Sequence, residues 1–231
     1  MKLSEKTGNI LFPMLGIIYA AAEYFWGVWY YRGLYQKGLL LSAADVTAET
    51  VLPMLRQHFI ISIPVFAMIG VSLLFFRKEL AAALLCRKKH GEKRLIAVGS
   101  AGIIYIIMLG AALLGGRATK LSVFYQWVYY LFFVALVEEL SFRFFVPMLL
   151  EKGHLPKWCL WVIPGILFGF MHTTIPVVKN GLTAEILVNG LSMIGGGIMG
   201  NCFFYYLRCW SGTIWLPVLI HAALDYAGIF G

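Results

Sequence analysis

Apolar stretches of about 20 residues recur along the whole chain, and this is the length that an α-helix needs to cross the hydrocarbon core of a bilayer. Apolar residues make up 61% of the 231 residues and charged residues only 13%, whereas a soluble domain carries about 25% charged residues. No polar segment is long enough to form a separate soluble domain. The sequence therefore predicts an all-α polytopic membrane protein with a single membrane-embedded domain over 1–231.

The apolar stretches predict about seven transmembrane helices. The segment 39–57 contains two acidic residues and an arginine, so it is too polar to span and is predicted to be an exposed loop with a short amphipathic helix. Two glycine pairs, Gly165 with Gly169 and Gly196 with Gly200, are typical of faces on which membrane helices pack closely. The predicted spans are 10–31, 58–76, 95–115, 123–148, 158–178, 186–208 and 213–231.

The net charge of +8 is unevenly placed, because seven of the 19 Lys and Arg residues lie in 77–94. Such a cluster could bind a nucleic acid or an acidic partner. It is also what the positive-inside rule expects of a cytoplasmic loop that touches anionic lipid, and this interpretation is favoured. With this loop inside, twelve Lys and Arg residues fall on the cytoplasmic side and six outside. The sequence thus predicts a cytoplasmic N-terminus, contact with the lipid bilayer and no nucleic-acid partner.

The four cysteines form no CxxC pair and no spacing that suits a metal ion. Reduced thiols that pack among apolar side chains are the favoured interpretation. They are Cys86, Cys159, Cys202 and Cys209.

Two adjacent glutamates, Glu138 and Glu139, lie inside an otherwise apolar stretch, and Arg143 follows shortly after them. A charged side chain at the bilayer centre costs roughly 2.5–3.5 kcal/mol by insertion scales, so a functional role is expected for ionisable residues there. Glu139 and Arg143 are four residues apart and are predicted to pair on one helix face in a structural role. Glu138 is rotated by about 100° from Glu139, so it lacks an adjacent partner and could take a proton.

Two later apolar helices place polar side chains at a similar depth. Phe168 and His172 are four residues apart, so the aromatic ring can pack beside the imidazole. His221 and Asp225 have the same spacing and share a face. A single polar cavity inside the bundle would satisfy these groups together with Glu138. Taken singly, each could instead be an ordinary structural hydrogen-bond or ion-pair partner, and Asn189 and Asn201 are weaker candidates.

The side chains of this predicted cavity suit the hydrolysis of a peptide bond. Glu138 could act as a general base on a water molecule that His172 orients. His221 could donate a hydrogen bond to the developing oxyanion, with Asp225 orienting it or assisting in the donation.

Three short motifs then match a known family, in order and on three separate apolar helices. EELSFR (138–143) fits EExxxR, FGFMH (168–172) fits FxxxH, and HAALD (221–225) fits HxxxN or HxxxD. In these residues the chain resembles the CAAX prenyl protease and bacteriocin-processing family of intramembrane glutamic endopeptidases, also called the ABI family. The resemblance implies a catalytic core over 123–231 that follows variable N-terminal helices over 1–122.

The resemblance also implies roles for residues and a biological setting. Glu138 and His172 are expected to activate water, and His221 with Asp225 to form the oxyanion site, without a metal or other cofactor. An ionised Asp225 cannot donate a hydrogen bond, so it would have to be protonated or to orient His221. The eukaryotic members cleave the last three residues from prenylated CAAX proteins. The short length and Lys-rich loop here resemble bacterial plasma-membrane members linked with bacteriocin self-immunity, peptide maturation or signalling, with a protein or peptide as substrate.

Three other functions stay open from the residues alone. Glu138, His172 and His221 could ligate zinc, although the metalloprotease motif HExxH is absent. Chains of Glu and His also relay protons in transporters, but no inverted repeat is visible. A non-catalytic immunity or scaffold protein could keep the same fold and act by binding. A metal-independent intramembrane endopeptidase is the leading interpretation.

Overall fold

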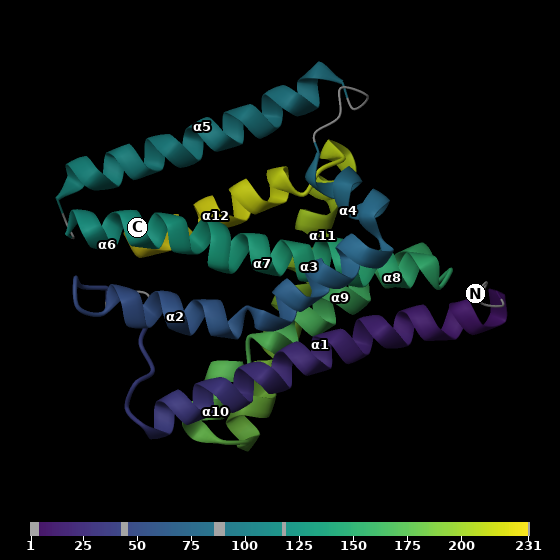
Figure 1. The fold of residues 1–231 in the computed structure, drawn as a ribbon, viewed down its shortest axis with the longest axis horizontal. Coiled ribbons are helices and arrows are strands. Elements are labelled where there is room, and N and C mark those ends of the chain that lie inside the picture. The colour runs from purple at the N-terminus through teal and green to yellow at the C-terminus, as the bar shows by residue number, and fades with distance from the viewer. Residues whose placement is uncertain (1–4, 43–45, 86–90, 117–118, 231) are drawn as a thin grey trace. The chain divides into compact units, whose positions relative to one another are not determined.

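The computed structural model describes residues 5–42, 46–85, 91–116 and 119–230, and every regular element within these ranges is a helix (Figure 1). The all-α prediction is therefore confirmed. The helices, in which η marks a π-helical segment, are α1 Glu5–Gln36, α2 Val51–Ile61, α3 Ile63–Phe75, α4 Arg77–Leu84, α5 Glu92–Gly115, α6 Lys120–Tyr129, η3 Tyr130–Ala135, α7 Leu136–Glu139, η4 Leu140–Phe145, α8 Val146–Lys152, α9 Lys157–Met171, α10 Thr174–Asn180, α11 Ala184–Ser211 and α12 Trp215–Phe230.

Four helical segments in the described ranges are long and apolar enough to cross a membrane, namely Lys6–Gln36, Glu92–Gly115, Lys157–Asn180 and Ala184–Ser211. A fifth is added if α2 and α3, which are bent by 49° relative to each other, cross as one span. The prediction of about seven spans is not confirmed. The helix α12 has 16 residues, and η3 and η4 divide the helical residues 120–152 into α-helical pieces of at most ten residues.

The segment 39–57 was predicted to contain a short helix, and the start of α2 at Val51 lies within it. The basic segment was predicted to be a loop, and it is partly helical. The basic segment 77–94 contains α4 and the start of α5. Of the cysteines, Cys159 is buried, Cys202 half-buried and Cys209 exposed, and all three are thiols, whereas Cys86 lies outside the described residues.

The chain folds into two compact units, and each is described by itself. Unit 1 consists of Met1–Leu40 and Leu140–Tyr206, and unit 2 of Leu41–Glu139 and Leu207–Gly231. The predicted division into helices over 1–122 and a core over 123–231 stays a prediction.

In unit 1, α1 packs along α8 and α10 (Figure 1). The core of this unit contains Val146 and Leu150 of α8, Leu160 of α9 and Tyr205 of α11. Tyr19 of α1 packs against the same cluster. Apolar side chains on four helices therefore share one buried contact region.

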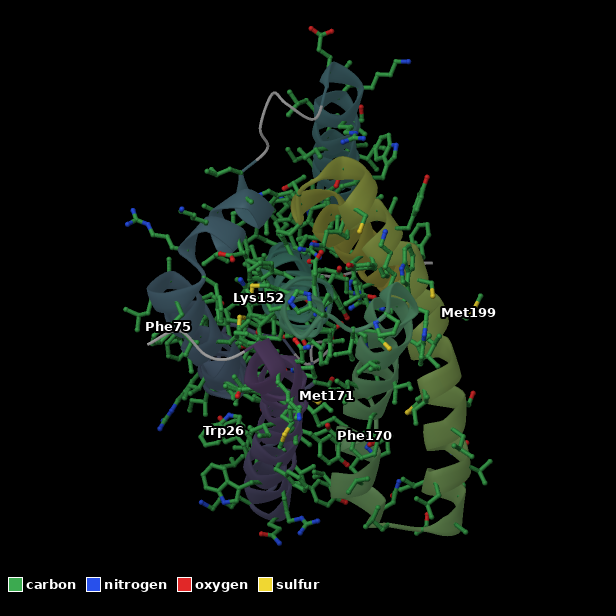
Figure 2. All side chains as sticks on the ribbon, turned by 90° about the vertical axis from the view of Figure 1, so that its right-hand side faces the viewer. Trp26, Phe75, Lys152, Phe170, Met171 and Met199 are labelled. Atoms are coloured by element: carbon green, nitrogen blue, oxygen red, sulfur yellow. The ribbon has the colours of Figure 1, made fainter. Side chains whose placement is uncertain are left out.

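The helices α9 and α11 approach each other closely at glycines. A Cβ atom added to Gly197 would lie 2.5 Å from the carbonyl oxygen of Gly165 and 2.6 Å from the nitrogen of Gly169. The packing role predicted for Gly165 and Gly169 is thus confirmed. Their partner is Gly197, whereas a Cβ atom on Gly196 or Gly200 would meet nothing within 4 Å. On the same helix Met199 is 74% exposed and points outward (Figure 2).

We expect Gly197→Ala to lower the melting temperature of the purified protein in detergent. The added methyl group has no room between α9 and α11, and overpacking typically costs about 1–3 kcal/mol. Gly196→Ala is the matched control, because its methyl group meets open space and alanine favours a helix over glycine by about 1 kcal/mol. Its melting temperature should be unchanged or higher. Equal melting temperatures for the two variants would contradict the close packing of α9 on α11.

In unit 2, α12 packs against α5 and against η3, and α5 also packs against α6 (Figure 1). Tyr105 of α5 and Trp127 of α6 exchange two hydrogen bonds. The Tyr105 Oη donates to the Trp127 carbonyl at 2.6 Å, and the Trp127 Nε1 donates to the Tyr105 carbonyl at 3.0 Å. The Tyr105 ring meets the ring of Tyr226 edge-on at 6.1 Å. These contacts hold α12 beside the helical segments that lead to Glu138.

Candidate active site

Three carboxyl groups of unit 2 surround the imidazole of His221. Its Nδ1 lies 2.9 Å from Oε1 of Glu139, and because a carboxylate accepts hydrogen bonds, Nδ1 is the donor. Its Nε2 lies 3.5 Å from Oε2 of Glu138 and 3.5 Å from Oδ2 of Asp225. The packing of α12 against α7 thus brings four of the predicted site residues together.

The four side chains differ in their access to the surroundings. The Glu139 side chain is fully buried and that of His221 is 9% exposed, whereas Glu138 is 26% and Asp225 32% exposed. Glu139 therefore holds the ring from the inside. Glu138 and Asp225 reach the accessible side of the cluster, where water or a substrate could meet them.

The start of α12 is held by the last carbonyls of α4. The Ala83 carbonyl accepts hydrogen bonds from the Thr213 hydroxyl at 3.0 Å and the Ile214 N–H at 2.8 Å. The Leu84 carbonyl accepts one from the Trp215 Nε1 at 3.0 Å. The last carbonyls of a helix have no partner within it, so these bonds satisfy α4 and fix the helix that carries His221. This junction was not predicted from the sequence, because the segment that forms α4 was expected to be a loop.

In unit 1, His172 lies at the C-terminal end of α9. Its Nδ1 donates a hydrogen bond to the carbonyl of Phe168 at 3.0 Å, and the two rings meet edge-on with their centroids 4.6 Å apart. The predicted packing of Phe168 beside the imidazole is confirmed. Because Nδ1 is the donor, Nε2 of the neutral ring carries a lone pair, and the residue is exposed.

Arg143 is fully buried among aromatic rings of unit 1. Its guanidinium lies 4.2 Å from the ring centroid of Phe168 and 5.3 Å from that of Phe204. Phe142 also packs edge-on against Phe168 at 5.5 Å. The Phe168 ring therefore contacts both the guanidinium of Arg143 and the imidazole of His172.

The structure thus gathers the predicted residues in two groups. Glu138, Glu139, His221 and Asp225 lie in unit 2, and Arg143, Phe168 and His172 in unit 1. A cavity shared by all of them, and the pairing of Glu139 with Arg143, would join the two units, and both stay predictions.

Glu138 and Glu139 each have a neighbour that spacing along a single helix did not predict. Glu138 has the imidazole of His221 as a neighbour, and Glu139 accepts a hydrogen bond from that ring. Both contacts come from another helix, which spacing along one helix cannot reveal. Of the weaker candidates, Asn201 is buried, with its Nδ2 donating to the Trp161 carbonyl at 2.6 Å, and Asn189 is exposed.

Within the part of the chain that the structure describes, no group of three or more His, Cys, Asp and Glu side chains is arranged to hold a metal ion.

Residues 120–227 match the sequence model of the family described as type II CAAX prenyl endopeptidase Rce1-like. This match, over a little under half of the chain, supports a relationship to the CAAX protease family. All three motifs lie inside the matched residues, and the helices α1 to α5 precede them. No curated protein and no solved structure matches the chain.

A relationship to the CAAX protease family fits the apolar helices of the fold. The chain is an integral membrane protein, and the matched family is one of prenyl endopeptidases. The class of substrate that the family implies is a peptide or a protein.

Proposed function

We propose that this protein is a metal-independent intramembrane endopeptidase in which a glutamate activates water. The observation that carries the proposal is the cluster around His221. Two partly exposed carboxylates, Glu138 and Asp225, converge on one imidazole that a buried third carboxylate orients. The cluster lies inside the segment that matches the family. Burying so many ionisable groups among apolar helices is expensive, and a catalytic role accounts for the cost.

Glu138 is the general base in this proposal. It takes a proton from a water molecule while the water oxygen attacks the carbonyl carbon of the scissile peptide bond. The lone pair on Nε2 of His172 orients that water. When the tetrahedral intermediate collapses, the carbon–nitrogen bond breaks and Glu138 gives its proton to the leaving amine.

His221 stabilises the negative charge that develops on the carbonyl oxygen. Its Nδ1–H is engaged by Glu139, so a hydrogen bond to the oxyanion requires a second proton on Nε2. When the ring is doubly protonated, each of its N–H groups has a carboxylate beside it. Glu139 accepts from Nδ1–H, and Glu138 and Asp225 each lie 3.5 Å from Nε2. We therefore assign Asp225 the role of orienting His221, not of donating a hydrogen bond itself.

The proposed substrate carries a CAAX-type C-terminus. We propose a cytoplasmic N-terminus from the distribution of Lys and Arg residues. We propose a bacterial plasma membrane because the short length and the Lys-rich segment resemble bacterial members of the family. The test is to incubate the purified protein in lipid nanodiscs with a fluorogenic farnesylated CAAX peptide and with its unprenylated counterpart. Faster cleavage of the farnesylated peptide is the expected result. Equal rates would remove the prenyl group from the proposal, and cleavage of neither would count against a CAAX-type substrate.

We expect the enzyme to keep its activity after prolonged treatment with EDTA or 1,10-phenanthroline. Glutamate-activated water needs no cation, and a zinc ion would take Glu138 as a ligand and leave no evident base, because Glu139 is bonded to His221. Elemental analysis of the purified protein should find no stoichiometric zinc. About one zinc per chain, with activity lost on chelation and restored by zinc, would favour a metallopeptidase instead.

A further inference from the structure

The helix α1 precedes the segment that matches the family, yet two of its tyrosines form hydrogen bonds with a residue inside one motif and a residue next to another. The hydroxyl of Tyr19 lies 2.7 Å from that of Ser141, two residues before Arg143. The hydroxyl of Tyr24 lies 3.2 Å from that of Thr173, the residue after His172. All of these residues belong to unit 1. A helix outside the family segment therefore contacts two of its three motif regions.

The bond between Tyr24 and Thr173 has a defined direction. Thr173 uses its single hydroxyl proton to donate to the carbonyl of Phe170 at 2.7 Å. Its oxygen is then the acceptor, and the Tyr24 hydroxyl is the donor. Tyr24 is 7% and Thr173 5% exposed, so this bond is made away from solvent.

The aromatic ring of Tyr24 supports the same turn. Its centroid lies 4.5 Å from that of Phe170, which Figure 2 shows between α1 and α9. Phe170, His172 and Thr173 form the turn between α9 and α10, in which the Thr173 N–H donates to the Phe170 carbonyl at 3.0 Å. Tyr24 thus contacts this turn on both sides of His172.

The position of the His172 ring depends on that turn. Its hydrogen bond and its ring contact are both made with Phe168 of its own helix, so they fix the ring relative to α9. The Tyr24 bond links the end of α9 to α1, a helix distant in sequence. A reactive geometry is sensitive to shifts of about 1 Å, which can cost on the order of 10²-fold in rate.

We propose that Tyr24 is a positioning residue for His172 and acts through the hydroxyl of Thr173. This inference rests on the proposed catalytic role of His172. Tyr24 does not touch the reacting atoms. Through Tyr24, the helix α1, which lies outside the family segment, helps to position the residue that orients the water.

The test compares Tyr24→Phe, which removes only the hydroxyl, with Tyr35→Phe on the same helix, where the tyrosine is 46% exposed. With the farnesylated CAAX peptide, we expect Tyr24→Phe to lower kcat by about tenfold or more and to leave KM within about twofold. Thr173→Val should lower kcat similarly, and Thr173→Ser, which restores a hydroxyl, should keep most of it. Tyr35→Phe should behave as wild type. A wild-type kcat in Tyr24→Phe would overturn the inference. So would a kcat in Thr173→Ser that is as low as in Thr173→Val, because the serine keeps the hydroxyl.

A second readout separates this inference from the proposed function. In protein labelled with ¹⁵N-histidine, the two ring signals of His172, assigned with His172→Asn, report its tautomer and surroundings. We expect them to shift in Tyr24→Phe and Thr173→Val but not in Tyr35→Phe. If the wild type cleaves no peptide, the proposed function fails and the shift still decides whether Tyr24 positions His172. Unchanged His172 signals in Tyr24→Phe would overturn the inference.

Discussion

Glu138→Gln is expected to abolish peptide cleavage while the protein still inserts and folds. The amide cannot take a proton from water, and loss of a general base typically costs roughly 10²–10⁴-fold in rate. The substitution keeps the shape of a side chain that is already 26% exposed, so the melting temperature should change little. The measurement is kcat with the farnesylated CAAX peptide at equal protein concentration.

Glu185→Gln is the matched control for this variant, because it makes the same chemical change at an exposed residue of α11. It should cleave the peptide at the wild-type rate. Wild-type turnover by Glu138→Gln would remove Glu138 from its assigned role. A large loss of melting temperature would show instead that the carboxylate serves the fold.

Arg143→Ala should have the opposite profile, with its main effect on stability. Arg143 is among the largest fully buried side chains, and its guanidinium lies 4.2 Å from the ring centroid of Phe168. Truncating a large buried side chain costs roughly 3–5 kcal/mol, and a desolvated cation–π contact adds to that loss. We expect a clear drop in melting temperature in detergent, larger than that of Glu138→Gln.

Arg56→Ala is the control for Arg143→Ala, because Arg56 is an exposed arginine of α2 and its loss should leave the melting temperature unchanged. Equal melting temperatures for Arg143→Ala and Glu138→Gln would contradict a structural role for Arg143.

The long apolar helices could be predicted from the sequence, whereas a short charged helix and the π-helical segments could not. Apolar length and composition indicated the long helices α1, α5 and α11, because a hydrophobic run of this length has few other uses. The helix α4 was missed because its charged residues resemble a loop. The π-helical segments η3 and η4, which flank Glu138 and Glu139, leave no periodic signal, since packing in the folded chain decides them.

The same limit applied to the site. Contacts within one helix follow from spacing, so the packing of Phe168 on His172 was predictable. The pair of Glu139 and Arg143 predicted from i,i+4 spacing stays a prediction, because Glu139 ends α7 in unit 2 and Arg143 lies in η4 of unit 1. The hydrogen bond from His221 to Glu139 joins residues 82 positions apart, and no local pattern encodes it.

The most direct test of the account is mass spectrometry of the products that the purified, EDTA-treated protein forms from a farnesylated CAAX peptide. A metal-independent endopeptidase of this family should release the last three residues as an intact tripeptide, and Glu138→Gln should release none. Removal of single residues from the end, or cleavage that disappears on chelation and returns with zinc, would contradict the account.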